Sequence, residues 1–245
     1  MITDKTDPSF TLWILDCPAQ PVAADIADCV AVFSASELDR LRNMRAPRRQ
    51  AEYLYGHSLL RRALDHSCPG WDAEASIYHA DGEPPRLLPH RAGNAITPLY
   101  FNLTHCDGKI ACAVSRDRRV GIDIEDRRRE RRFDELVRNY FAHEERREWE
   151  TCLSEARADW FYHLWTLKES YIKARLDGIS STSTQTAFRV GSSEVAAWWS
   201  YSLCWREHWQ LGLTVSAPLP ETIVRVAEDG SVDTIVVGTA LHAVG

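Results

Sequence analysis

The sequence lacks several features that would assign it to a class at once. It has 245 residues, and no stretch is apolar for long enough to span a bilayer. The seven cysteines form no CxxC pair, and the closest two, Cys106 and Cys112, match no common zinc spacing. The N-terminus carries Asp4, Lys5 and Asp7 and has no apolar run typical of a signal peptide. We therefore expect reduced thiols in a cytoplasmic protein that does not contact membranes.

An excess of positive charge is also absent. The formal net charge is -6, whereas a general nucleic-acid binder is usually basic, so no nucleic-acid partner is expected. Arginine is nevertheless concentrated from Arg40 to Arg62 and from Arg127 to Arg132. Each stretch is either a solvated face or a surface for an anionic ligand or an acidic partner. The 44% of hydrophobic residues are enough for a well-packed core.

The hydrophobic pattern predicts an α+β fold. Residues 47–64 and 133–176 have helical spacing, and Ser34 with Glu37 resembles a capping box at a helix start. Asp107-Gly108 is a strong hairpin signal. Eight segments have the composition of strands: 11–15, 99–104, 110–115, 120–125, 198–204, 209–215, 222–226 and 234–237.

The segment VGIDIE, residues 120–125, carries two carboxylates on a predicted strand. Side chains alternate along a strand, so Asp123 and Glu125 point to one face, while Ile122 and Ile124 point to the other. Two neighbouring carboxylates repel each other, and a hard cation between them removes that repulsion. The alternative is a solvent-exposed edge strand whose polar face is acidic.

Two further segments carry candidate functional residues. On the helix WTLKESYIK, Trp165, Glu169 and Lys173 are four residues apart and share one stripe. The Glu169–Lys173 pair can also be ordinary support of a surface helix. In FNLTH, at a strand end, His105 is a possible donor to a phosphate, although a single histidine near a turn is more often a satisfied polar residue.

Taken in order, NLTH, VGIDIE and WTLKESYIK resemble the motifs of the Sfp-type 4'-phosphopantetheinyl transferases, over roughly residues 48–178. The resemblance implies an enzyme with two similar α+β lobes, 1–117 and 118–245, related by a pseudo-twofold axis. The N-terminal lobe would hold the nucleotide end of coenzyme A, and the C-terminal lobe the metal and the catalytic helix, with the active site in the cleft between them. The reaction would move the phosphopantetheine arm of coenzyme A to a serine of an acyl or peptidyl carrier protein, releasing adenosine 3',5'-bisphosphate.

The resemblance also assigns metal and phosphate ligands. Asp123, Glu125 and Glu169 match the family's metal-binding carboxylates, which would hold Mg2+, or Mn2+ in its place. Lys173 matches the family's phosphate-contacting lysine, and Lys168 lies in the same motif. Either lysine could stabilise the leaving group.

The nucleotide end of coenzyme A is expected to meet the first lobe. Thr104 and His105 match the segment that holds it, and Arg48 and Arg49 lie where basic residues meet its 3'-phosphate. One departure concerns a Gly-Lys-Pro loop of the family, which is Gly82-Glu83-Pro84 here. An acid at this place would weaken the attraction to phosphate if its side chain points inward.

The carrier serine needs a base. Glu145 falls where the family has a candidate, and Glu169 or a water on the metal are the alternatives. Glu145 can equally be a surface acid of its helix, among other charged residues.

The partners follow from the same resemblance. The run Arg127–Arg132 could dock an acidic carrier protein, or be a solvated loop, and a monomer is expected because the cleft forms within one chain. Two other functions remain open. A metal-dependent pyrophosphate hydrolase would cleave coenzyme A without a carrier. A non-catalytic module that binds coenzyme A or a carrier protein would show no turnover, and its binding of the carrier would survive the Glu169→Ala substitution.

Overall fold

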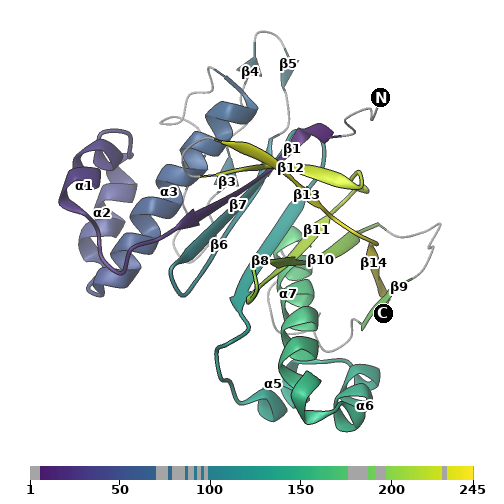
Figure 1. Cartoon of the computed structure of the whole chain (residues 1–245). Helices are drawn as coiled ribbons and strands as arrows, with labels where there is room; N and C mark the ends of the chain where they lie inside the picture. Colours follow the sequence, from purple (N-terminus) through teal and green to yellow (C-terminus); the bar gives the residue numbers. More distant parts are fainter. Residues whose placement is uncertain are drawn as a thin grey trace. The chain divides into compact units, whose positions relative to one another are not determined.

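The structure is a computed structural model. It describes residues 6–69, 77–78, 86–87, 91–92, 95–96, 99–175, 187–190, 197–227 and 231–244. The chain divides into two compact units, whose elements are labelled in Figure 1. The N-terminal unit consists chiefly of Pro8–Asp117, and the C-terminal unit consists chiefly of Arg118–Ile223.

The N-terminal unit combines helices with a five-stranded sheet of order β13-β12-β1-β7-β6. Its helices are α1 (Ala23–Val30), α2 (Ala35–Asn43) and α3 (Pro47–Ser67). The strands of the sheet are β1 (Thr6–Asp16), β6 (Tyr100–Cys106), β7 (Lys109–Ser115), β12 (Thr222–Val226) and β13 (Val232–Val236). Short strands form two further pairs: β2 (Ile77–Tyr78) with β3 (Arg86–Leu87), and β4 (Arg91–Ala92) with β5 (Ala95–Ile96).

Local sequence signals explain two features of this unit. Asp107 (φ 41°) and Gly108 (φ 87°) form the predicted two-residue turn between β6 and β7. This turn needs two positive φ angles, which an Asp-Gly pair adopts at little cost. The predicted capping box is also present, because the backbone N–H of Ser34 donates to Glu37 at 2.9 Å and the Ser34 hydroxyl accepts from the backbone N–H of Glu37 at 3.4 Å.

Helix α3 packs against β7 and β6 and closes the core of the N-terminal unit (Figure 1). Its apolar residues recur at helical spacing, so one face of the helix is buried. The core residues on α3, β1 and β7 include Leu59, Leu60, Leu64, Trp13, Leu15, Ile110, Cys112 and Val114. This packing positions the N-terminal end of α3 and the C-terminal end of β6, which carry the basic candidates.

The C-terminal unit has a second five-stranded sheet, of order β8-β11-β10-β14-β9. Its strands are β8 (Val120–Asp126), β9 (Ala187–Val190), β10 (Trp199–Trp205), β11 (Trp209–Val215) and β14 (Leu241–Val244). Its helices are α5 (Phe133–Tyr140), α6 (His143–Thr151) and α7 (Arg157–Arg175), and a 3-10 turn, η1 (Ser154–Ala156), precedes α7.

Helix α7 lies directly against β8 and β11 because glycines leave room for its backbone (Figure 1). A Cβ on Gly121 would be 2.0 Å from the carbonyl oxygen of Ser170, and a Cβ on Gly212 would be 2.1 Å from another carbonyl oxygen of α7. Gly212 pairs with Asp123 across the sheet. Because side chains alternate along β8, the face with Gly121 also carries Asp123 and Glu125. The two carboxylates therefore lie on the face that α7 covers.

The structure confirms the α+β class that the sequence predicted. It adds α1, β9 and β14, which the sequence patterns did not indicate. Strands β12 and β13 belong to the same sheet as β1. The sequence prediction had instead assigned all of residues 118–245 to the C-terminal lobe. The lobe boundaries, the pseudo-twofold relation and the cleft stay predictions. Within the described part of the chain, no helix is long and apolar enough to cross a membrane. All seven cysteines are free.

Candidate active site

The candidate site begins with a carboxylate on β8 and a lysine on α7. Asp123 is buried, and its Oδ1 accepts a hydrogen bond from the Nζ of Lys173 at 2.7 Å. The same Nζ donates to the backbone oxygen of Ile122 at 3.3 Å. One helical turn before Lys173, Glu169 lies on the same stripe of α7. The close approach of α7 to β8 thus joins two of the three sequence motifs.

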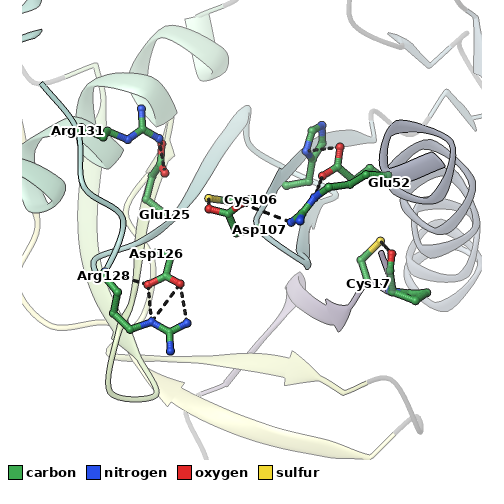
Figure 2. A network of polar contacts seen from close by, with 11 residues as sticks. Cys17, Glu52, Cys106, Asp107, Glu125, Asp126, Arg128 and Arg131 are labelled. Atoms are coloured by element: carbon green, nitrogen blue, oxygen red, sulfur yellow. Dashed lines mark hydrogen bonds and ion pairs between the residues drawn. The ribbon is translucent and has the colours of Figure 1, made fainter. Parts of the chain in front are cut away.

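The second carboxylate of β8 has a basic partner of its own. One terminal nitrogen of Arg131, Nη2, donates to both oxygens of Glu125, at 2.6 and 2.7 Å. Figure 2 shows the guanidinium turned toward this carboxylate. Burial has the largest single effect and lowers the pKa of Arg131, but Glu125 and Tyr162 together raise it by more, so the net result is a raised pKa. Arg131 was predicted only as one member of the arginine run, so this pairing was missed.

The pKa of Glu169 depends on the charges of both strand carboxylates. Burial raises the pKa of Glu169, and Asp123 and Glu125 raise it further, whereas Lys173 and Arg131 act in the opposite direction. Glu169 is therefore close enough to both strand carboxylates for their charges to oppose its ionisation, and two cations lie near enough to favour it. The structure thus pairs Asp123 with Lys173 and Glu125 with Arg131, and it places Glu169 where these charges affect its pKa.

The donor set of this cluster suits a hard divalent cation. Three carboxylates supply only oxygen ligands, which Mg2+ and Mn2+ prefer, and their mutual repulsion is what a cation relieves. The ligands are not preassembled, however. Among the residues that the structure describes, no group of three or more His, Cys, Asp or Glu could hold a metal ion as placed. Lys173 and Arg131 hold two of the carboxylates instead.

Lys168 and Glu145 form a separate buried ion pair. The Nζ of Lys168 lies 2.8 Å from Oε2 of Glu145, and the two side chains are 3% and 2% exposed. The same oxygen accepts from the backbone N–H of Ala142 at 2.8 Å, at the start of α6. The ammonium also lies over the rings of Phe141 and Phe188. Burial lowers the pKa of Lys168, and the Glu145 carboxylate opposes this effect. The pair ties α6 to α7.

This pairing leads to a stability prediction. We expect Lys168→Met to lower the free energy of unfolding by about 3 kcal/mol, because it leaves the Glu145 carboxylate buried without its cation. Urea unfolding at neutral pH measures this change. The double variant Lys168→Met with Glu145→Gln removes both charges and should regain most of the loss. A double variant no more stable than the single one would contradict this account.

In the N-terminal unit, the candidates Arg48 and His105 both contact Glu52, an acid that the sequence did not indicate as part of a site. Oε1 of Glu52 accepts from Nε of Arg48 at 3.2 Å, and Oε2 lies 3.4 Å from Nδ1 of His105. Arg48 also donates to Asp107 at 3.4 Å. Glu52 and Asp107 are labelled in Figure 2. The i,i+4 spacing of Arg48 and Glu52 on α3 could have predicted the pairing of these two side chains.

Two further candidates for binding coenzyme A lie in the N-terminal unit. Arg49 is exposed on α3, and Thr104 is buried on β6. The Gly82-Glu83-Pro84 loop lies outside the described residues.

The run Arg127–Arg132 is not uniformly free for docking. Arg127 pairs with Asp159, Arg128 pairs with Asp126, and Arg131 pairs with Glu125. Arg132 is 86% exposed. Docking of a carrier on this run stays a prediction.

Comparisons with known proteins agree with the motifs. A family model described as the 4'-phosphopantetheinyl transferase superfamily matches residues 119–212, which include β8 and α7. The 4'-phosphopantetheinyl transferase HetI of Nostoc sp. is 29% identical over 170 residues, which cover 69% of each chain. The 4'-phosphopantetheinyl transferase AcpT of Salmonella typhi is 33% identical over 148 residues, which cover 60% of this chain and 70% of the relative.

A solved structure was also matched. It is the holo-[acyl-carrier-protein] synthase of Thermotoga maritima, with a TM-score of 0.31 and 17% identity, covering 43% of this chain and 66% of that chain. The family assignment rests on the sequence relatives instead. With 33% identity across 70% of a curated relative, and a family model that matches the segment carrying Asp123, Glu125 and Glu169, the chain belongs to the 4'-phosphopantetheinyl transferase superfamily.

Proposed function

We propose that the chain is an Sfp-type enzyme that transfers the 4'-phosphopantetheine arm of coenzyme A to a serine of an acyl or peptidyl carrier protein. The reaction would depend on Mg2+, or Mn2+ in its place, and would release adenosine 3',5'-bisphosphate. One observation supports this proposal most. Three carboxylates, Asp123, Glu125 and Glu169, interact electrostatically beside Lys173, where α7 crosses β8.

The transfer exchanges one phosphorus–oxygen bond for another. The serine oxygen bonds to the phosphorus that carries the pantetheine arm, and the bond from this phosphorus to the adenosine bisphosphate oxygen breaks. We assign the serine proton to Glu169. Glu145 is the weaker candidate for this role, because its carboxylate is buried in the ion pair with Lys168. Lys173, which is 28% exposed, would stabilise the charge on the departing phosphate.

Asp123, Glu125 and Glu169 would hold the metal ion. When bound, the ion offsets the negative charge that develops on the pyrophosphate. The chain's own part is to orient these carboxylates. Asp123 is fixed by Lys173, and the glycine contact between β8 and α7 sets the distance from the strand to Glu169.

The nucleotide end of coenzyme A would meet Arg48, Arg49, Thr104 and His105. Lys168 was a further candidate, but its burial beside Glu145 favours a structural role. For Arg48 and His105 to bind phosphate, they must turn from Glu52, because its carboxylate would repel the ligand. We expect the enzyme to act as a monomer in the cytoplasm.

The test is carrier modification followed by mass spectrometry. With coenzyme A, Mg2+ and an apo carrier protein, we expect the carrier to gain one phosphopantetheine, and a chelator should abolish the gain. The same mixture without carrier tests the hydrolase alternative, which predicts rapid release of phosphopantetheine to water. Folded enzyme that modifies none of several apo carriers in the presence of Mg2+ would rule the proposal out.

A further inference from the structure

Arg131 lies in the segment between β8, which ends at Asp126, and α5, which begins at Phe133. Its guanidinium reaches back to Glu125, and both oxygens of that carboxylate lie within 2.7 Å of Nη2. The pair is largely shielded from water, with side chains that are 20% and 10% exposed. The Coulomb attraction within a shielded ion pair is weakened less by water and salt than that within an exposed pair. Arg131 can therefore compete with a metal ion for the carboxylate of Glu125.

From this we propose that Arg131 is a positioning residue, one that holds Glu125 as an internal counter-ion and must release it before the metal site forms. This inference rests on the proposed function, in which Glu125 is a metal ligand. It agrees with the finding that, among the described residues, no group of three or more His, Cys, Asp or Glu is placed to hold a metal ion.

Charge balance indicates why Arg131 would leave rather than stay. Counted as formal charges, the three acids Asp123, Glu125 and Glu169 and the two cations Lys173 and Arg131 sum to one net negative charge. Adding a divalent cation would give one net positive charge if Arg131 stayed. It would give a neutral cluster if Arg131 moved away. In a shielded site the neutral arrangement is favoured, because an uncompensated charge is costly there.

Two aromatic rings beside Arg131 can bind its guanidinium when it is not paired with Glu125. Its Cζ lies 5.9 Å from the ring centroid of Tyr162 and 5.8 Å from that of Trp165. Aromatic faces attract a guanidinium, so these rings can keep the cation after it has left Glu125. Lys173 has less freedom, because it is part of α7 and already donates to Asp123 and to a backbone oxygen of β8.

The decisive experiment is titration of Mn2+ into metal-free protein without coenzyme A, followed by the EPR signal of free Mn2+. We expect Arg131→Gln to bind Mn2+ about tenfold more tightly than the wild type, because a competing cation has been removed. Arg132→Gln is the matched control. It removes the same charge one residue away, from a side chain that is 86% exposed and pairs with Glu135, and should change the affinity less than twofold.

The outcome separates this role from others. If Arg131 supported the metal site by orienting Glu125, Arg131→Gln would bind Mn2+ more weakly, and the inference would be wrong. A purely structural Arg131 would lower the Tm equally with and without Mn2+, whereas competition predicts a larger Mn2+-induced rise in Tm for the variant. Should Arg131→Gln fail to fold, Arg131→Lys keeps the charge but loses the planar guanidinium, and its affinity should lie above that of the wild type.

A wild-type measurement with coenzyme A distinguishes the two proposals. If Mn2+ does not bind even with coenzyme A present, the metal part of the proposed function fails. If it binds then, but Arg131→Gln gains no affinity without coenzyme A, only the inference about Arg131 fails.

Discussion

Gly121→Ala is expected to unfold the C-terminal unit, or to lower its free energy of unfolding by more than about 4 kcal/mol. The added Cβ would lie 2.0 Å from the carbonyl oxygen of Ser170 and 2.4 Å from the backbone nitrogen of Ala174. Both atoms belong to the backbone of α7, so relief requires the whole helix to move away from β8. Gly212→Ala should act in the same way, because its Cβ would lie 2.1 Å from the carbonyl oxygen of Thr166. Urea unfolding monitored by tryptophan fluorescence measures both changes.

Gly56→Ala is the matched control for this prediction. Its Cβ would meet the end of the Leu103 side chain at 3.1 Å, and a side chain can shift where a backbone cannot. Gly56 lies inside α3, where alanine is the better helix former by about 1 kcal/mol. We therefore expect a net change below about 1 kcal/mol. If Gly121→Ala were as mild as Gly56→Ala, α7 would not be as tightly packed on β8 as the structure indicates.

Glu169→Gln is expected to reduce carrier modification by about a thousandfold while leaving the fold intact. Glutamine keeps the size of the side chain but can neither accept the serine proton nor provide a charged metal ligand. The rate constant for carrier modification at saturating Mg2+ and coenzyme A measures the loss. Glu155→Gln, on the exposed turn η1, is the control and should keep wild-type activity. More than a tenth of the wild-type rate in Glu169→Gln would contradict both roles.

The same variant should be more stable than the wild type in a chelator. The pKa of Glu169 is raised above its ordinary value of 4.5, first by burial and then by the neighbouring carboxylates. The folded state therefore holds this proton more tightly than the unfolded state does. Stability is lost as the pH rises from about 4.5 through the folded pKa, because ionisation favours the unfolded chain. Glu169→Gln lacks this loss, so its advantage in Tm should grow over that pH range. An advantage that is absent or shrinks with pH would contradict the raised pKa.

Short-range patterns predicted much of the fold. The Asp107-Gly108 turn, the Ser34–Glu37 capping box and the strand of Asp123 and Glu125 all formed as expected, because each depends on neighbours within a few residues. The order of three motifs indicated the transferase superfamily, and the family model and the relatives confirm this assignment and the enzyme class.

Partners that lie far apart in the sequence were not predictable in this way. The pairing of Lys168 with Glu145 buries both side chains, which their polar segments gave no reason to expect. The return of β12 and β13 to the sheet of β1 depends on pairing between opposite ends of the chain. Spacing along the chain carries no signal for such contacts, because they form only when separate elements pack.

The sequence by itself therefore determined the class of enzyme, and it singled out the acids that we propose as metal ligands, Asp123, Glu125 and Glu169. Periodicity decides which face of a strand or helix carries a side chain, and this needs no knowledge of the rest of the fold. Only the tertiary structure decided which cations those acids meet. Lys173 reaches Asp123 across the contact between α7 and β8, and Arg131 folds back onto Glu125. Charge partners are set by distance in space, and for Lys173 and Asp123 that distance depends on the two glycines that face α7.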